Sequence, residues 1–427
     1  MKLILKNGHI IDPATGKDQE SDIVIVDGVI DKIGNAAGGK ADTIIDFKGI
    51  IVAPGFIDMH VHFREPGFEH KETIETGVAS AIAGGFTAVC CMPNTNPAID
   101  DESVARYVHE RGRQVHDGIV DVFPVGAATK GRAGEELAPM AELASAGAVG
   151  FTDDGSPIAS AEIMRRALEY SSMYGVPVIQ HAEEPTMSKG GCVNEGFNAT
   201  RAGLPGIPGI AEELMVARDL ILLAYVPDAK YHVAHVSTGG TILRVRDAKK
   251  RKLRVTCEVT PHHFTLTDEM ILHYDTNTKM NPPLRTADDV LAMKEALRDG
   301  TIDVIATDHA PHTIDEKEVE YSHAPFGIVG LETAIGLAIT ELVEQHYLTL
   351  AGMIEKFSTA PRKILSLPEI RIEEGAEADL TIFDPSAAWT VEPNKFRSKS
   401  KNSPFASYSL RGKPVAIVHN KLFRRCE

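Results

Sequence analysis

The stretch IVAPGFIDMHVHF, at residues 51–63, begins with apolar residues and carries two histidines, His60 and His62, near its end. This pattern is typical of a buried parallel strand that carries functional side chains at its end. Stretches with the same design recur along the chain, and they are GFTAVCCMPN (85–94), DVFPVGAAT (121–129), AVGFTDDG (148–155), VPVIQHAE (176–183), YHVAHVST (231–238), LRVTCEVTPHH (253–263) and DVIATDHAPH (303–312).

Most gaps between these stretches can hold one amphipathic helix. In SAEIMRRALEYSSMYG, residues 160–175, Ser160 is suited to cap the start of a helix and Gly175 to end it. A regular alternation of strands and helices predicts an α/β fold, and eight such units favour a (β/α)8 barrel of the TIM type. An open doubly wound sheet is the structural alternative.

The two ends of the chain have a different texture. Short alternating segments such as LILKNGHII and DIVIVDGVIDKIG near the start, and ADLTIFD and KPVAIVHN near the end, indicate β hairpins. Neither end has enough strands for a stable sheet of its own, so we expect the two to form one small β domain. The predicted division is 1–54 and 369–427 for this domain and 55–368 for a metal-dependent barrel.

Composition excludes several classes of protein. The 427 residues carry 60 acidic and 44 basic side chains, a formal net charge of -16, with no run of Lys or Arg. A nucleic-acid or anionic-membrane surface needs a local positive field, so we expect neither partner. Five cysteines without paired spacing predict reduced thiols, and the absence of a signal-like or membrane-spanning stretch predicts a cytoplasmic protein.

Polar and ionisable residues cluster at the strand ends, and they are His60, His62 and Arg64, then Asn94, Asp153 and Asp154, His181, His235, and Asp308, His309 and His312. Taken singly, a histidine at a strand end is more often hydrogen bonded than bound to metal. The interpretation changes when these residues are taken together, because the carboxyl ends of barrel strands meet at one rim and would bring their side chains close to one another. Mixed imidazole and carboxylate ligands at that rim predict a site for zinc or a similar divalent ion.

Six motifs, in order along the chain, resemble the dihydroorotases of the amidohydrolase superfamily, and they are APGFIDMHVHFREPG, TDDG, QHAEE, AHVSTGG, KMNPPLR and ATDHAPH. The resemblance is to the bacterial class in which an aspartate bridges two metal ions, and it covers essentially the full chain. Hydantoinases and allantoinases share the HxH motif and the aspartate of the eighth strand. In those enzymes a carboxylated lysine usually bridges the two metals, whereas the TDDG motif of this chain contains no lysine.

The resemblance implies two zinc ions per subunit. One would be bound by His60, His62 and Asp308, and the other by His181 and His235, in addition to a bridging aspartate. On chemical grounds, either of the two aspartates in the TDDG motif can bridge two metal ions. Alignment with the family motif selects Asp154 over Asp153.

The implied reaction is the reversible hydrolysis of dihydroorotate to N-carbamoyl-L-aspartate in de novo pyrimidine biosynthesis. A metal-bound hydroxide would attack the ring amide, and Asp308 would carry the proton to the departing nitrogen. Arg64 would bind the substrate carboxylate through two N–H groups of its planar guanidinium.

The resemblance assigns further residues to this small anionic substrate, and they are His62, Asn94, Asn281 and His312, with main-chain groups of Phe326 and Gly327. Without the resemblance, Asn94 and Asn281 are better interpreted as loop-capping residues. Neither spacing nor resemblance gives a role to His262, His263 or His309.

Two other functions remain open from the sequence. A hydantoinase or dihydropyrimidinase would act on neutral rings, which offer Arg64 no partner. A catalytically silent paralogue could serve as a structural subunit, although such a protein should have lost ligands. The dihydroorotase family includes dimers and larger complexes, so the resemblance also implies a homo-oligomer.

Overall fold

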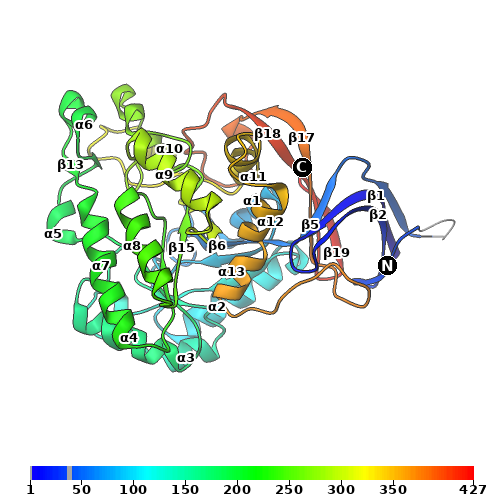
Figure 1. Cartoon of the computed structure of the whole chain (residues 1–427), viewed down its shortest axis with the longest axis horizontal. Coiled ribbons are helices and arrows are strands. Elements are labelled where there is room, and N and C mark those ends of the chain that lie inside the picture. The colour runs from blue at the N-terminus through cyan, green and yellow to red at the C-terminus, as the bar shows by residue number, and fades with distance from the viewer. Residues whose placement is uncertain (1, 36–40) are drawn as a thin grey trace.

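The computed structural model describes residues 2–35 and 41–427, which form a barrel of parallel strands with a smaller β sheet beside it (Figure 1). The barrel strands are β6 (Phe56–Val61), β7 (Phe86–Cys91), β8 (Asp121–Pro124), β9 (Gly126–Ala127), β10 (Phe151–Thr152), β11 (Val178–Gln180), β14 (Tyr231–Val233), β15 (Val255–Val259) and β16 (Val304–Ile305). Strands β8 and β9 together occupy one strand position of the barrel, between β7 and β10. On one side Val125 N donates to Cys91 O of β7, and on the other Gly126 N donates to Gly150 O beside β10. All eight predicted strands are therefore present.

The barrel closes between its first and last strands. Val61 pairs with His309 in a parallel bridge, and His62 N donates to His309 O at 2.8 Å. An open sheet would leave these two edges apart, so that alternative is wrong. The predicted TIM-like barrel is confirmed.

Helices surround the strands, as Figure 1 shows. They are α1 (Ile74–Gly84), α2 (Glu102–Gln114), α3 (Met140–Ser145), α4 (Ala161–Ser172), α7 (Ile210–Tyr225), α8 (Gly239–Lys250), α9 (Ala287–Arg298), α11 (Ala334–Ala338), α12 (Leu350–Phe357) and α13 (Thr359–Ile364). Ser160 caps α4 by accepting from Ile163 N, as expected. The helix ends at Ser172, three residues before the left-handed Gly175 that the sequence suggested as its end.

Short elements fill the loops at the strand ends, and they are α5 (Pro185–Ser188), β12 (Val193–Asn194), α6 (Phe197–Ala202), β13 (Gly206–Ile207) and α10 (Ile314–Lys317). All five cysteines are buried free thiols. Among the helices of residues 2–35 and 41–427, none has both the length and the apolar character needed to cross a membrane.

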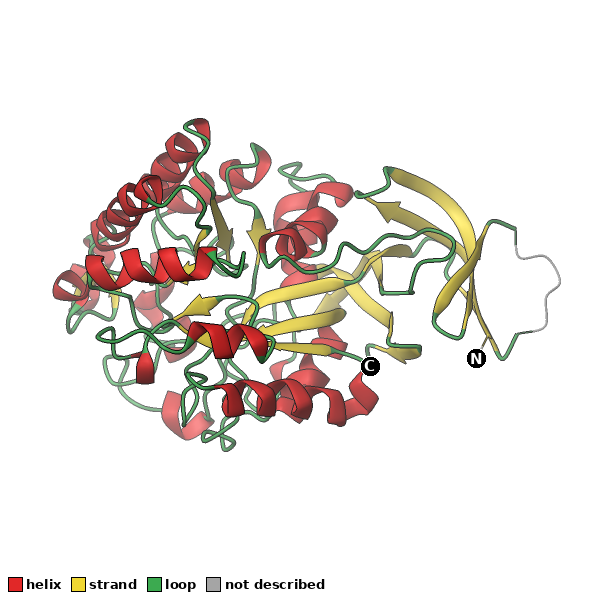
Figure 2. Cartoon of the chain, turned by 90° about the horizontal axis from the view of Figure 1, so that it is seen from below, coloured by secondary structure: helices red, strands yellow, loops and turns green. Residues whose placement is uncertain are grey.

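The small sheet joins the two ends of the chain. Its strands are β1 (Lys2–Asp12), β2 (Lys17–Val26), β3 (Val29–Ile33), β4 (Thr43–Asp46), β5 (Ile51–Pro54), β17 (Leu380–Thr390), β18 (Ser409–His419) and β19 (Leu422–Arg425). The ends meet where β5 pairs antiparallel with β17, with Val52 opposite Ile382. Figure 2 shows this sheet at the end of the molecule away from most helices. The single small β domain is confirmed, whereas its exact limits at residues 54 and 368 stay predictions.

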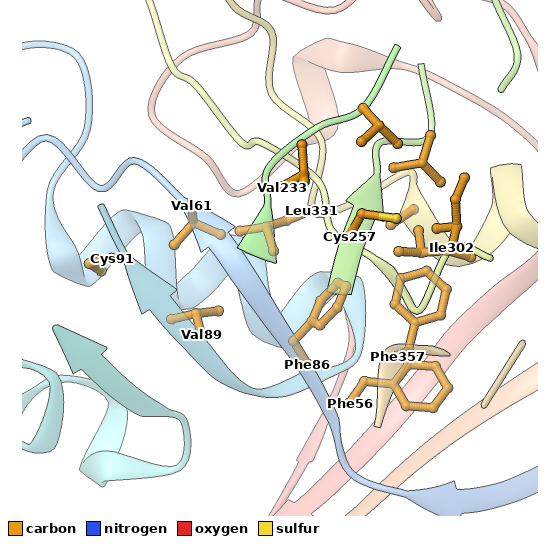
Figure 3. Packing of buried hydrophobic residues seen from close by; sticks show 14 of the residues in the cluster. Phe56, Val61, Phe86, Val89, Cys91, Val233, Cys257, Ile302, Leu331 and Phe357 are labelled. Carbon is orange, nitrogen blue, oxygen red and sulfur yellow. The ribbon is translucent and has the colours of Figure 1, made fainter. Parts of the chain in front are cut away.

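Aromatic rings fill the junction between the sheet and the barrel (Figure 3). The ring of Phe56, on β6, stacks on Phe357 of α12 at 5.3 Å and lies 5.9 Å from Phe383 of β17. Phe86 meets Phe357 edge-on at 6.0 Å. These rings hold the first barrel strand, and hence its functional end, against the small sheet.

Replacing Phe56 by alanine should lower the free energy of unfolding by about 3–5 kcal/mol, because the fully buried ring leaves a cavity between barrel and sheet. Denaturant unfolding followed by circular dichroism measures this change. The control is Phe197→Ala, since Phe197 is 80% exposed and its loss should change the stability by less than about 0.5 kcal/mol. Equal stabilities of the two variants would contradict the assignment of this junction.

Candidate metal centre and substrate pocket

A cavity of about 320 Å³ opens at the carboxyl ends of the barrel strands. Its lining contains every predicted site residue except His60, namely His62, Arg64, Asn94, Asp154, His181, His235, Asn281, Asp308, His312, Phe326 and Gly327. His60 is fully buried and faces Asp154 and Asp308. Residues spread over most of the barrel sequence therefore meet at one place.

The first strand and the last supply one group of ligand atoms. His60 Nε2 and His62 Nε2 lie 3.6 Å and 3.0 Å from Asp308 Oδ1. Burial raises the pKa of Asp308, but the nearby charges of His60 and His62 more than offset it and bring the pKa to about 2. The carboxyl group is therefore ionised at neutral pH.

The two oxygens of Asp154 face two different sets of imidazoles. Its Oδ2 lies 3.4 Å from His60 Nε2 and 3.5 Å from His62 Nε2. Its Oδ1 lies 3.3 Å from His235 Nε2 and 3.6 Å from His181 Nδ1. A carboxylate held in this way is suited to bridge two ions.

Asp153 has a different environment. Its carboxylate accepts from Thr129 N at 2.9 Å and from Thr129 Oγ1 at 2.5 Å, and its main-chain oxygen accepts from Arg132 Nε. The side chain thus orders the neighbouring strand end, and the geometry favours Asp154 as the bridge.

Sequence reasoning missed a carboxylate beneath the site. Glu258 Oε1, on β15, lies 2.6 Å from His60 Nδ1, and Glu258 Oε2 lies 3.2 Å from His232 Nε2. Burial opposes ionisation of Glu258, but the charge of His60 outweighs it and lowers the pKa far below its usual range. The signal was present as a lone acidic residue inside the otherwise uncharged strand VTCEV.

Hydrogen bonds at the Nδ1 atoms set the direction of the two imidazoles. His60 Nδ1–H donates to Glu258, and His62 Nδ1–H donates to Asn94 Oδ1 at 2.7 Å. Each Nε2 then lies on the side of Asp154 and Asp308, and in a neutral imidazole it would offer its lone pair to a metal ion bound there.

The donor atoms fit a divalent metal ion. His60 Nε2 is buried and has no hydrogen-bond partner among the described residues, which is costly unless another group binds it. Two sets of donor atoms lie within 4.8 Å of one another, His60 with His62 and Asp308, and His60 with Asp154 and His235. Buried imidazole and carboxylate ligands suit zinc or a similar first-row ion.

Arg64 enters the cavity from the loop after β6. Its Nε donates to Pro311 O at 3.3 Å, and its Nη2 lies 3.4 Å from His312 Nε2. Burial lowers the pKa of Arg64 to about 10. Within residues 2–35 and 41–427, its guanidinium forms no ion pair with a carboxylate.

The histidines without a predicted role lie near the cavity and do not line it. His309 Nε2 lies 3.4 Å from Glu72 Oε2, and His263 bonds to Thr260 Oγ1 and Pro282 O. His262 is also buried. Asn281, by contrast, lies at the site, with its amide nitrogen 3.2 Å from His181 Nε2.

Known proteins resemble this chain over nearly its whole length. A protein-family model described as Dihydro-orotase-like matches residues 49–240. The dihydroorotase of Pelotomaculum thermopropionicum is 52% identical over 418 residues, which cover 98% of this chain and 97% of the relative. That of Pelobacter propionicus is 50% identical over 419 residues, 98% of each chain.

The chain belongs to the dihydroorotase family. Among solved structures, the L-hydantoinase (dihydropyrimidinase) from Arthrobacter aurescens matches with a TM-score of 0.86 at 24% identity, covering 99% of this chain and 95% of that one. A D-hydantoinase matches with a TM-score of 0.85 at 21% identity, with the same coverage. At these identities the likeness concerns the barrel and its accompanying β domain, so it supports the fold of this dihydroorotase-family chain and leaves its substrate to the site residues.

Asp154→Ala should remove more bound divalent metal than Asp153→Ala, because the carboxylate of Asp154 faces the imidazoles and that of Asp153 binds Thr129. Elemental analysis of the purified variants, with circular dichroism to show that both are folded, measures the difference. The reverse order would move the bridge by one residue.

Proposed function

We propose that this chain catalyses the reversible hydrolysis of dihydroorotate to N-carbamoyl-L-aspartate, a step of de novo pyrimidine biosynthesis. Relatives about half identical over nearly the whole chain bear the name dihydroorotase. The observation that carries the proposal is the buried guanidinium of Arg64, which lines the cavity beside the candidate metal ligands.

A buried cation needs an anionic partner. Only 9% of Arg64 is exposed, and its contacts in the described chain are with a carbonyl oxygen and an imidazole. Leaving a buried charge unpaired is costly, and the planar fork of Arg matches a carboxylate. Dihydroorotate and N-carbamoyl-aspartate both carry a carboxylate that can fill this place, whereas a neutral hydantoin ring does not.

The proposed cofactor is a pair of zinc ions. His60, His62 and Asp308 would hold one ion, His181 and His235 the other, and Asp154 would lie between them, as its two oxygens suggest. When bound, the ions would lower the pKa of a water molecule and polarise the ring amide carbonyl.

Asp308 is placed to move the proton. Its ionised carboxylate lines the cavity and can accept a proton from the attacking water. It can then return that proton to the ring nitrogen as the amide bond breaks. The left-handed backbone at Asp308, with φ of 50°, turns this side chain at the end of the eighth strand.

The remaining groups would bind and orient the ring. Asn94 and Asn281 line the cavity with the main chain of Phe326 and Gly327. His312 Nε2 donates to Phe326 O at 2.8 Å, which keeps that stretch of main chain at the cavity.

The test of the function is an assay of the purified, metal-analysed protein on dihydroorotate and on hydantoin. Turnover of dihydroorotate with two equivalents of divalent metal supports the proposal. Turnover of hydantoin alone would instead make the chain a hydantoinase, and a metal-free, inert protein would favour the structural-subunit alternative.

Asp308→Asn should lower kcat by about 100- to 10,000-fold, because the amide cannot accept the proton. Metal content should remain substantial, since His60, His62 and Asp154 are retained. Asp315→Asn, at an exposed position on α10, is the matched control and should keep normal turnover. Near-normal kcat in the Asp308 variant refutes the shuttle.

Arg64→Met should raise KM for dihydroorotate about 10- to 100-fold, the equivalent of a charge-assisted interaction of about 1.5–3 kcal/mol. Steady-state kinetics measure it, with Arg64→Lys as a variant that keeps the charge and loses the fork. An unchanged KM in the Met variant would count against Arg64 as the carboxylate-binding group.

A further inference from the structure

The segment between β17 and β18, residues 391–408, leaves the small sheet and packs against the end of the eighth barrel strand. Ser398 Oγ and Lys399 N donate to the buried carboxylate of Glu72, which also lies within hydrogen-bond distance of His309. Further along, Val329 N donates to Asn402 O at 2.9 Å. A part of the small β domain is thus attached to the strand end that carries Asp308.

The side chain of Asn402 binds both sides of the loop at the substrate pocket. Its Nδ2 donates to Ala310 O and to Gly327 O, each at 3.1 Å. Its Oδ1 accepts from His312 N, also at 3.1 Å. Asn402 is buried, and two carbonyl acceptors on one side with an N–H donor on the other fix the orientation of its amide.

These contacts reach the group that holds the substrate anion. Ala310 and His312 flank Pro311, and the carbonyl of Pro311 accepts from Arg64 Nε at 3.3 Å. Displacing this turn would therefore displace the guanidinium as well.

The adjoining stretch of main chain around Gly327 is equally constrained. Gly327 has a φ of +124°, and a Cβ at this position would lie 2.6 Å from Ala310 Cβ. The two stretches of main chain are in close approach, and the amide of Asn402 holds them together through both carbonyl oxygens.

We propose that Asn402 is a positioning residue for substrate binding, which acts through the main chain at residues 310–312 and 327 and so sets the place of Arg64. The small β domain then contributes to substrate affinity, although the side chain of Asn402 does not itself line the cavity. This inference rests on the proposed dihydroorotase function.

The test compares Asn402→Ala and Asn402→Asp with Asn394→Ala, an exposed asparagine in the same segment. The Ala variant removes all three hydrogen bonds, and the Asp variant keeps the shape but turns an oxygen toward two carbonyl oxygens. Both should raise KM for dihydroorotate by about 10-fold or more, with kcat changed by less than about 3-fold and metal content unchanged. The Asn394 variant should match the wild type.

Hydrogen exchange of peptides spanning residues 309–329 gives a readout that does not depend on the substrate. Exchange in this region should be faster in both Asn402 variants than in the wild type and the control. An unchanged KM in an otherwise active protein, with only a lower melting temperature, would overturn the inference and leave Asn402 a structural residue. If the wild type does not act on dihydroorotate, the proposed function fails, and unchanged exchange would then overturn the positioning role separately.

Discussion

The parallel pairing of Val61 with His309 is the contact on which the site depends. It closes the barrel and brings the HxH motif of the first strand beside Asp308 of the last. Asp58, fully buried on the first strand, reinforces the closure by accepting from Thr307 N at 3.1 Å, and burial raises the pKa of Asp58 to about 7. Without this closure, ligands almost 250 positions apart in sequence would have no reason to meet.

A second constraint acts on the direction of the imidazoles. A histidine at a strand end can rotate and present either nitrogen, so nearness alone does not make a metal site. Glu258 and Asn94 remove this freedom by binding the Nδ1 atoms of His60 and His62. These hydrogen bonds keep the Nε2 atoms on the side of the carboxylates, so less of the binding free energy of an ion would be lost to ordering the ligands.

Features that depend on local pattern could be predicted from the sequence. Apolar strands ending in His or Asp indicated the barrel and the rim. The choice of Asp154 over Asp153 rested on the family resemblance and stays a prediction, which the two oxygens that face the imidazoles favour. Contacts made across the barrel between residues of ordinary type could not be predicted. Glu258 is one acidic residue among many until β15 places it beneath His60.

The same limit applies to Asn402, which lies in a polar stretch of the C-terminal segment with no motif around it that marks a site. Only the return of this segment onto the eighth strand brings its amide to Ala310 and Gly327. The break between β8 and β9 could not be predicted from the sequence either, because the stretch DVFPVGAAT has the composition of one continuous strand.

Anomalous X-ray diffraction at the zinc absorption edge, from crystals of the zinc-loaded protein, tests the dinuclear centre most directly. We expect two peaks on either side of the Asp154 carboxylate, one beside His60 and His62 and the other beside His181 and His235. A single peak away from Asp154, or none in a fully active protein, would contradict a dinuclear centre at this site.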